Sequence, residues 1–151
     1  MVDSNPMKLF QYWDTGEPPP EVDAWIESFR TKNPEMRHRL YDRGAASWFI
    51  GKHFGERERR AFDACAIPST QSDYFRLCAI IRSGGIYVDA DLECVRPLAS
   101  LVATAPHSLM LMWDLQLVHS FMMYRAPSDP FLCACLELAT RNIEDRWPGG
   151  A

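Results

Sequence analysis

Two aspartates separated by a single residue, Asp89 and Asp91, are the residues whose type and spacing point most directly to chemistry. They follow the apolar segment Ile86–Val88, which has the length and residue types of a buried strand. The carboxyl end of such a strand is where open α/β sheets bind their ligands. Two hard oxygen ligands suit Mg²⁺ or Mn²⁺, which proteins usually hold together with substrate phosphates. The motif therefore predicts a divalent metal site shared with a phosphate-bearing substrate.

A second pair of charged residues, Asp73 and Arg76, precedes this strand. The segment Tyr74–Ile81 is apolar apart from Arg76, which predicts a helix buried on nearly all sides. Residues three apart share a helix face, so we expect the pair to lie near the packed core and to orient each other. Gly84 and Gly85 should end the helix, one of them in the left-handed C-cap conformation. A buried ion pair with a purely structural role would show the same pattern.

The spaced set formed by these residues resembles the DXD-motif glycosyltransferases related to yeast initiating mannosyltransferases and to the catalytic domains of clostridial glucosylating toxins. The matching residues are Ser72-Asp73, Arg76, the Gly84-Gly85-Ile86-Tyr87 run and Asp89-Ala90-Asp91. A lone Asp-x-Asp would be a weak signal, whereas this spaced set is specific. The resemblance implies an α/β fold of the nucleotide-diphospho-sugar transferase (GT-A) type, with a mostly parallel central sheet flanked by helices.

The resemblance also implies a reaction, in which a sugar moves from a UDP-sugar or GDP-sugar donor to an acceptor hydroxyl with retention of configuration. Asp89 and Asp91 would bind Mn²⁺ or Mg²⁺ at the donor pyrophosphate. Asp73 would accept hydrogen bonds from ribose or sugar hydroxyls, and Arg76 would orient Asp73 or reach the donor sugar. In this family a Trp after the first strand lies near the nucleotide base, so Trp13 is expected to stack on the base. A core Trp that closes the strand end is the alternative for Trp13.

The sequence departs from the family in two places. Near residue 120 the family usually has an Asn, whereas this chain has Leu117-Val118-His119-Ser120, where His119 or Ser120 could substitute. Relatives also continue through further segments that complete the metal and pyrophosphate site. We therefore expect one transferase-like domain over residues 1–151 without the C-terminal part of the fold, either as a minimal form or as a piece of a longer protein. By family analogy, the acceptor is a growing polysaccharide or a lipid-linked glycan.

The remaining elements follow from periodicity and from helix and turn signals. Ser69 or Thr70 is expected to cap the central helix, and Ser128 or Asp129 the last helix. The buried face of the last helix is expected to comprise Phe131, Leu132, Cys135, Leu136 and Leu138. The predicted strands are Lys8–Trp13, Arg37–Tyr41, a brief edge strand Glu93–Arg96, Ser108–Trp113 and Val118–Tyr124 (a strand or a helix start), and the predicted helices are Glu21–Lys32, Ala45–Phe54, Glu56–Ala64, Leu98–Thr104 and Pro130–Arg146.

Bulk properties narrow the class of protein. The 151 residues suffice for one domain, and the net charge of −4 argues against nonspecific nucleic-acid binding. No apolar run is long enough to span a bilayer and no signal-peptide core is visible, which favours a cytoplasmic protein, at most peripherally associated with the inner face of the membrane. The five cysteines form no disulfide-scaffold pattern, and Cys133-x-Cys135 has the wrong spacing for a zinc pair.

Two other functions fit part of the pattern. An apolar strand that ends in Asp-x-Asp also opens haloacid-dehalogenase-type phosphatases, but there it lies near the N-terminus and continues differently from Leu92-Glu93. The stronger alternative is a non-catalytic module that binds a sugar nucleotide or a partner protein without turnover.

Overall fold

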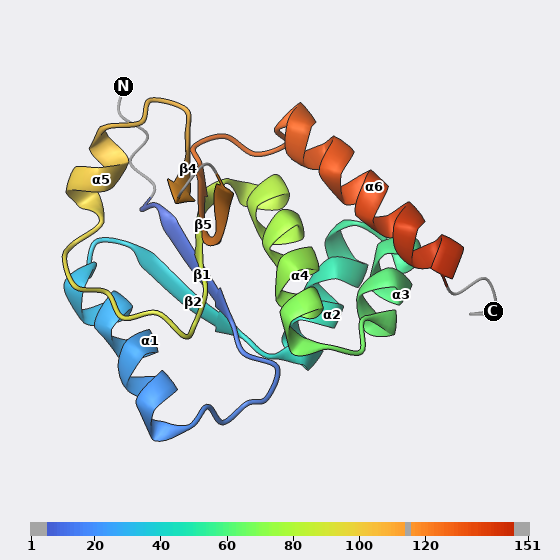
Figure 1. The fold of residues 1–151 in the computed structure, drawn as a ribbon, viewed down its shortest axis with the longest axis horizontal. Coiled ribbons are helices and arrows are strands. Elements are labelled where there is room, and N and C mark those ends of the chain that lie inside the picture. Colours follow the sequence, from blue (N-terminus) through green and yellow to red (C-terminus); the bar gives the residue numbers. More distant parts are fainter. Residues whose placement is uncertain (1–5, 114–115, 147–151) are drawn as a thin grey trace.

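The computed structural model describes residues 6–113 and 116–146, which form a five-stranded sheet with helices on both faces (Figure 1). In chain order the elements are β1 (Lys8–Tyr12), α1 (Pro20–Lys32), β2 (Arg37–Tyr41), α2 (Arg43–His53), α3 (Glu56–Ala64), α4 (Pro68–Ser83), β3 (Gly85–Val88), α5 (Ala99–Ala103), β4 (Ser108–Trp113), β5 (Gln116–Tyr124) and α6 (Pro130–Arg146). The predicted bounds of β2, α3, β4 and α6 are confirmed, and the other predicted helices and strands shift by a few residues, except the edge strand Glu93–Arg96.

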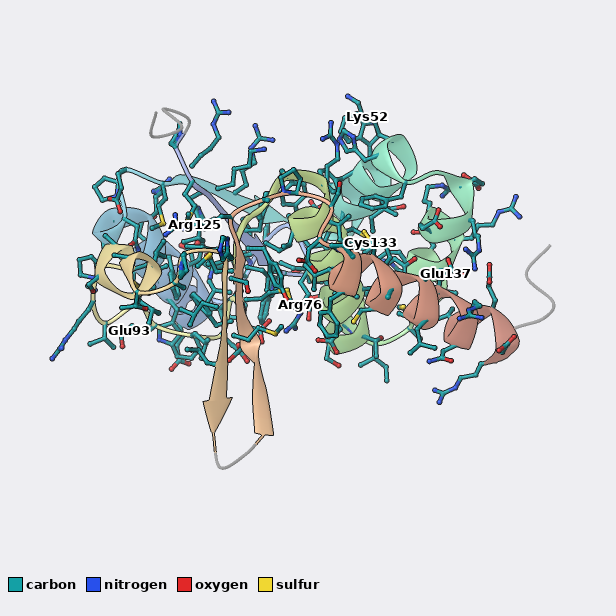
Figure 2. All side chains as sticks on the ribbon, turned by 90° about the horizontal axis from the view of Figure 1, so that it is seen from above. Lys52, Arg76, Glu93, Arg125, Cys133 and Glu137 are labelled. Atoms are coloured by element: carbon teal, nitrogen blue, oxygen red, sulfur yellow. The ribbon has the colours of Figure 1, made fainter. Side chains whose placement is uncertain are left out.

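The sheet has the strand order β2-β1-β3-β5-β4. β1 pairs in parallel with both β2 and β3, whereas β5 runs antiparallel to β3 and to β4. The α/β fold is as expected, but the sheet is mixed rather than mostly parallel in its pairings. β4 and β5 form a hairpin, and its second strand, β5, lies between β3 and β4 and runs antiparallel to both. In Figure 2 this hairpin extends beyond the body of the domain.

Helices cover the two faces of the sheet unequally, with α2, α3, α4 and α6 on one side and α1 and α5 on the other (Figure 1). Residues alternate along a strand between the two faces of the sheet. Phe10 and Tyr87 therefore pack into the apolar core on one face, and Leu9 and Ile86 pack into a second apolar core on the opposite face. β1 and β3 are buried centrally, whereas β2 is an edge strand with a largely exposed Arg-His-Arg-Leu-Tyr sequence.

Gly84 and Gly85 join α4 to β3 where no side chain would fit. A Cβ on Gly84 would lie 2.7 Å from the carbonyl oxygen of Arg125, and one on Gly85 would lie 2.6 Å from that of Lys8. Positive φ was expected at one of them and occurs at both, but the cap residue Gly84 combines φ 62° with ψ −175°. The predicted left-handed C-cap is therefore wrong, because the chain extends at once into β3 instead of closing a final turn.

Helix α4 begins earlier than the sequence suggested. Its cap residue is Ile67 without a side-chain cap, and Pro68 occupies the first turn, where its missing N–H costs nothing. Ser69 and Thr70 are thus already helical, and the Thr70 hydroxyl donates to the Ile67 carbonyl instead of capping. In α6, by contrast, Asp129 accepts bonds from the backbone of the first turn, as expected.

The segment after Asp91 is a loop, and the predicted strand Glu93–Arg96 does not form. Its backbone bonds instead to side chains of α1 and the residue after it. The Cys94 N–H donates to the Ser28 hydroxyl at 2.8 Å, and the Leu98 N–H donates to the Asn33 side-chain carbonyl at 2.7 Å. These tethers hold the loop against α1 and fix the chain that leaves the Asp-Ala-Asp motif.

Other expectations about the surface can now be corrected or confirmed. Phe131 and Leu138 are exposed, so the buried face of α6 is narrower than predicted and centres on Leu132 and Leu136. The charged helix α3 is solvated as expected, and its Arg57 pairs with two glutamates of α6. All five cysteines are free thiols, three of them buried. Among the described helices, none has both the length and the apolar character that a membrane crossing needs.

Candidate active site

One cleft of about 580 Å³ brings together all five residues that the sequence analysis singled out. The end of β1 and the two residues after it (Tyr12–Asp14) reach the cleft, as do the residues that follow β3 (Asp89–Asp91), and α4 supplies the rest. The lining residues are Tyr12, Trp13, Asp14, Pro68, Ser69, Ser72, Asp73, Arg76, Asp89, Ala90 and Asp91.

The cleft forms where the carboxyl ends of two neighbouring strands, β1 and β3, lie side by side. β1 and β3 are parallel neighbours, with Leu9 opposite Ile86 and Phe10 opposite Tyr87, so both strands end at the same edge of the sheet. Open α/β sheets bind ligands at this edge. The Asp89 N–H donates to the Ser120 carbonyl of β5 at 2.9 Å, which orients the first residue of the motif.

Arg76 is the charged residue at the centre of the site. Its side chain is only 6% exposed, and its Nη2 atom lies 2.6 Å from Asp73 Oδ1 and 3.1 Å from Asp89 Oδ1. Its guanidinium carbon lies 4.8 Å from the centre of the Tyr87 ring, a distance at which the ring face attracts the cation. A buried guanidinium with two carboxylates and an aromatic face is held in one orientation.

Asp73 differs from its partner in exposure. Its side chain is 61% exposed, so only Arg76 of the pair lies in the core. The expectation that both residues are packed is therefore wrong for Asp73. Although the two residues are one helical turn apart, Arg76 lies in the core and Asp73 lies at the cleft, where its carboxylate is accessible to a ligand.

The two aspartates of the motif also lie in different environments. Asp89 is 25% exposed, and burial raises the pKa of its carboxyl above the ordinary value, with Asp91 adding to the rise and Arg76 opposing it. Asp91 is exposed at the mouth of the cleft. A pair of this kind offers one partly buried and one open carboxylate to a cation.

The hydroxyl of Tyr87 is buried under this arrangement and makes no hydrogen bond of good geometry within the described residues. Ser72 and Asp89 are neighbouring polar side chains that act on its pKa, which burial raises. Buried hydroxyls are nearly always bonded. An unsatisfied hydroxyl next to Arg76 and Asp89, two residues of the cleft, indicates a place for a water or a ligand atom.

Trp13 occupies both of the positions considered for it. Its side chain is partly buried against Ala90 and the α1 residues Val22 and Ile26, and it also lines the cleft. The structure thus leaves one part of the indole available to a ligand. His119, considered as a substitute for the missing Asn, has its side chain outside the described part of the chain.

Sequence reasoning missed the buried polar side chains beneath the site. The amide nitrogen of Gln11 donates to the Asp89 carbonyl at 3.3 Å, and its Oε1 accepts a hydrogen bond from His38 Nε2 at 2.7 Å. Gln71 accepts from the Tyr12 hydroxyl at 2.6 Å, which ties the end of β1 to α4. Both glutamines are buried. The sequence feature that could have revealed them is a polar residue inside a strand or helix that is otherwise largely apolar.

The residues present fit a divalent metal. Mg²⁺ and Mn²⁺ are commonly held by one or two carboxylates and complete their coordination with substrate phosphates and waters. Asp89 and Asp91 supply that number of carboxylates. Within the described residues, no group of three or more potential ligands gathers, so a cation here would rely on the substrate for its remaining contacts.

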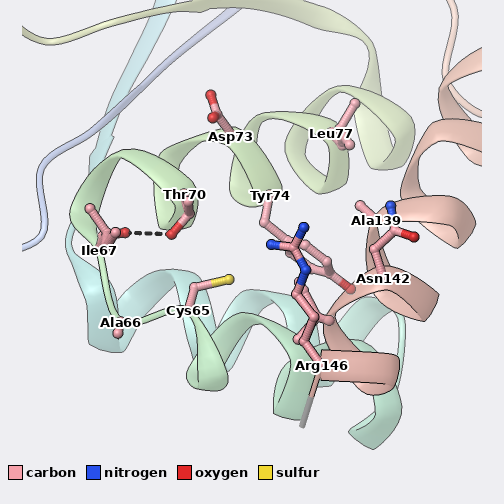
Figure 3. A pocket seen from close by; sticks show the side chains of 11 residues that line it. Cys65, Ala66, Ile67, Thr70, Asp73, Tyr74, Leu77, Ala139, Asn142 and Arg146 are labelled. Atoms are coloured by element: carbon pink, nitrogen blue, oxygen red, sulfur yellow. Dashed lines mark hydrogen bonds between the residues drawn. The ribbon is translucent and has the colours of Figure 1, made fainter.

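A second hollow, of about 370 Å³, lies between α4 and α6 and is distinct in chemistry (Figure 3). Its walls are mostly apolar, with Tyr74, Leu77 and Ile143 among them. Asp73 borders both hollows, but Figure 3 shows its carboxylate pointing away from Cys65 and Tyr74. Among the residues that line it, Asp73 is the single carboxylate, so we assign the chemistry to the first cleft.

Comparison with known proteins agrees with this site. The sequence matches the family described as "Glycosyltransferase sugar-binding region containing DXD motif" over residues 19–108, more than half of the chain. The chain belongs to this family. The matched segment includes Asp73, Arg76, Asp89 and Asp91, whereas Trp13 precedes it. No curated protein matches the sequence.

Among solved structures, the fold is similar to "PaToxG Glycosyltransferase", with a TM-score of 0.67 and 15% sequence identity. The similarity covers 92% of this chain and 60% of that one. It shows a glycosyltransferase fold of the GT-A type. The family match also places the Asp-Ala-Asp motif in a glycosyltransferase family, which argues against the haloacid-dehalogenase-type phosphatase.

Proposed function

We propose that this chain carries the donor-binding half of a divalent-metal-dependent, retaining glycosyltransferase that uses UDP-sugar or GDP-sugar. The observation that carries the proposal is the single cleft in which Trp13, Asp73, Arg76, Asp89 and Asp91 meet at the carboxyl ends of β1 and β3. A nucleoside diphosphate sugar has a base, a ribose, a pyrophosphate and a sugar, and the cleft offers an aromatic face, the exposed carboxylate of Asp73, the two carboxylates of the Asp-Ala-Asp motif and a buried guanidinium.

Each residue has a role that its environment supports. Asp91, open to solvent, and Asp89 would hold Mn²⁺ or Mg²⁺, which would stabilise negative charge on the leaving pyrophosphate. Asp73 would accept hydrogen bonds from ribose or sugar hydroxyls. Arg76 fixes Asp73 and Asp89 relative to each other and can donate to the donor sugar.

The reaction breaks the bond between the anomeric carbon and the phosphate oxygen and forms one to the acceptor oxygen. With retention, the acceptor proton can pass to the departing phosphate oxygen, so the proposal names no protein base. The acceptor would be a hydroxyl of a growing polysaccharide or a lipid-linked glycan, handled in the cytoplasm or at the inner face of the membrane. Because the chain spans about 60% of its structural neighbour, acceptor binding and complete turnover belong to the proposal as well.

Calorimetry with UDP, GDP and their sugar conjugates tests the proposal, first with Mn²⁺ present and then after chelation. We expect one nucleotide to bind only with the metal, and Asp91→Asn to abolish that binding. Glu93→Gln is the matched control, because Glu93 is exposed two residues later and does not line the cleft. Release of nucleotide from the sugar conjugate would then establish an enzyme.

The other outcomes are equally informative. Metal-dependent binding without any nucleotide release, with acceptors supplied, would favour the non-catalytic sugar-nucleotide-binding module. No binding of any nucleotide to the folded chain would overturn the assignment of the cleft.

A further inference from the structure

A group of positive side chains lies at the other end of α4 from the cleft. Lys8 of β1, Arg37 and Arg39 of β2 and Arg82 of α4 line one shallow depression of about 220 Å³, and no carboxylate lines it. We call these four residues the basic surface. The strand register explains the grouping, because Lys8 lies opposite Arg37 and both face the same side of the sheet as Arg39.

Among the residues that the structure describes, no carboxylate neutralises the charges of the basic surface. Elsewhere, many of the arginines pair with carboxylates, as Arg30, Arg57 and Arg59 do. In the described part of the chain, no carboxylate forms an ion pair with Lys8, Arg37, Arg39 or Arg82. Burial and the charges of Arg82, Arg39 and Arg37 lower the pKa of Lys8, which reflects the crowding.

Local structure accounts for only part of this group. A cation in the last turn of a helix is stabilised by the helix dipole, which explains Arg82 in α4 and Lys52 in α2. Lys8, Arg37 and Arg39 come from strands, where no such dipole acts. In a chain of net charge −4, an uncompensated positive area requires another explanation.

An exposed aromatic residue lies on α2, the helix whose Phe49 and His53 line the depression. Trp48 on α2 is 64% exposed, and the ammonium group of Lys52 lies 4.5 Å from its ring centre. Phe49 and His53, the residues that follow Trp48 and Lys52 on the same helix, line the depression. His53 accepts a hydrogen bond from Arg82 at 3.1 Å, which connects α2 to the basic surface. In Figure 2, Lys52 projects from the upper edge of the molecule, opposite the β4–β5 hairpin.

We propose that the basic surface, together with Trp48 and Lys52, docks the protein on an anionic lipid bilayer. Clustered Lys and Arg side chains attract anionic headgroups, and an exposed Trp is suited to the boundary between headgroups and acyl chains. The depression is smaller than the pockets that hold drug-sized ligands, and its cations come from three elements, which suits an extended anionic surface better than one small ligand. This proposal does not depend on the transferase assignment.

The orientation of α4 gives the docking a consequence. Asp73 at the cleft and Arg82 at the basic surface are nine residues apart on this helix, about 14 Å along its axis. A protein held by the basic surface would therefore present its cleft away from the lipid. Soluble donors would reach the cleft freely while the protein stays at the membrane.

Sedimentation of the full chain with vesicles tests the proposal. We expect binding to phosphatidylcholine vesicles that contain phosphatidylserine, none to phosphatidylcholine alone, and weakening as salt is raised. Arg37→Glu/Arg39→Glu should lower the partition coefficient about 100-fold. The matched control is Arg96→Glu/Arg146→Glu, which reverses two exposed charges outside the basic surface and should change binding little. Circular dichroism verifies that both variants are folded.

The insertion of Trp48 has its own readout. Brominated lipids should quench tryptophan fluorescence in the wild type and much less in Trp48→Phe. Absence of binding to phosphatidylserine vesicles by the folded chain, or an equal loss in the control variant, would overturn the proposal. So would binding of duplex DNA or inorganic polyphosphate without vesicle binding, because the surface would then recognise free polyanions.

Discussion

The Nη2 atom of Arg76 lies 3.1 Å from Oδ1 of Asp89, thirteen residues further along the chain. This contact joins helix α4 to the end of β3 and holds the first aspartate of the motif from the buried side of the cleft. Because the same guanidinium also holds Asp73, one buried cation sets the separation of two carboxylates that belong to different elements. The position of the helix relative to the strand is therefore part of the site.

The Asp89 carboxyl should make both stability and metal binding depend on pH. Its pKa is raised in the folded state, chiefly by burial. The folded protein thus binds this proton more tightly than the unfolded chain does. The stabilisation from Asp89 is complete below the unfolded pKa and is lost as the pH rises through the raised folded pKa.

Asp89→Asn should therefore leave the free energy of unfolding at pH 7 unchanged or higher, while it removes metal-dependent nucleotide binding. The Asn carbonyl can still accept the bond from Arg76. Urea unfolding of both proteins at about pH 4 and pH 7 measures the first effect, and calorimetry measures the second. A variant that is clearly less stable at pH 7 would show that the charge on Asp89 is needed to hold Arg76.

Asp73→Ala should weaken binding of the sugar nucleotide and lower the free energy of unfolding by less than about 1 kcal/mol, as is typical of exposed ion pairs. Arg76 retains Asp89 in this variant. Arg76→Ala is the contrast within the same helix, and it should cost about 3 kcal/mol or more because it leaves Asp89 without its buried partner. Similar losses in the two variants would contradict the exposure of Asp73.

The sequence was sufficient for the motif and its elements because their signals are local. Gly84 and Gly85, the apolar run of α4 and the two aspartates are all within one short stretch, and in the structure Asp89 and Asp91 line the cleft together with Asp73 and Arg76. The failures concern distant partners. The segment after Asp91 looked like a strand, but its N–H groups bond to Ser28 and Asn33, more than sixty residues away in the sequence.

Exposure was also hard to predict from the sequence. Asp73 and Arg76 share a helix face, yet the side chain of Asp73 is exposed and that of Arg76 is buried, because the burial of each depends on the elements packed around α4. The basic surface arises only when β1, β2 and the end of α4 meet. No local sequence pattern predicts that these distant segments pack together.

Tyr87→Phe should separate ligand binding from folding. Removing a buried hydroxyl that lacks a partner should leave stability unchanged or raise it by about 1 kcal/mol. If a donor oxygen or a bound water completes this hydroxyl, sugar-nucleotide binding should fall about fivefold in the same variant. Thermal unfolding and calorimetry on one preparation give both numbers. A loss of stability would mean that Ser72 or Asp89 already satisfies the hydroxyl within the protein.

Trp13→Ala should weaken UDP or GDP binding by about 1–3 kcal/mol, the range observed when an aromatic platform under a base is removed. Binding of inorganic pyrophosphate with Mn²⁺ should be unchanged, because that ligand has no base to stack. Trp25→Ala is the matched control, since Trp25 packs against the same apolar cluster as Trp13 but does not line the cleft. If pyrophosphate and nucleotide binding fall together in Trp13→Ala, Trp13 acts by packing against Ala90 and supporting the motif, and not by contact with the base.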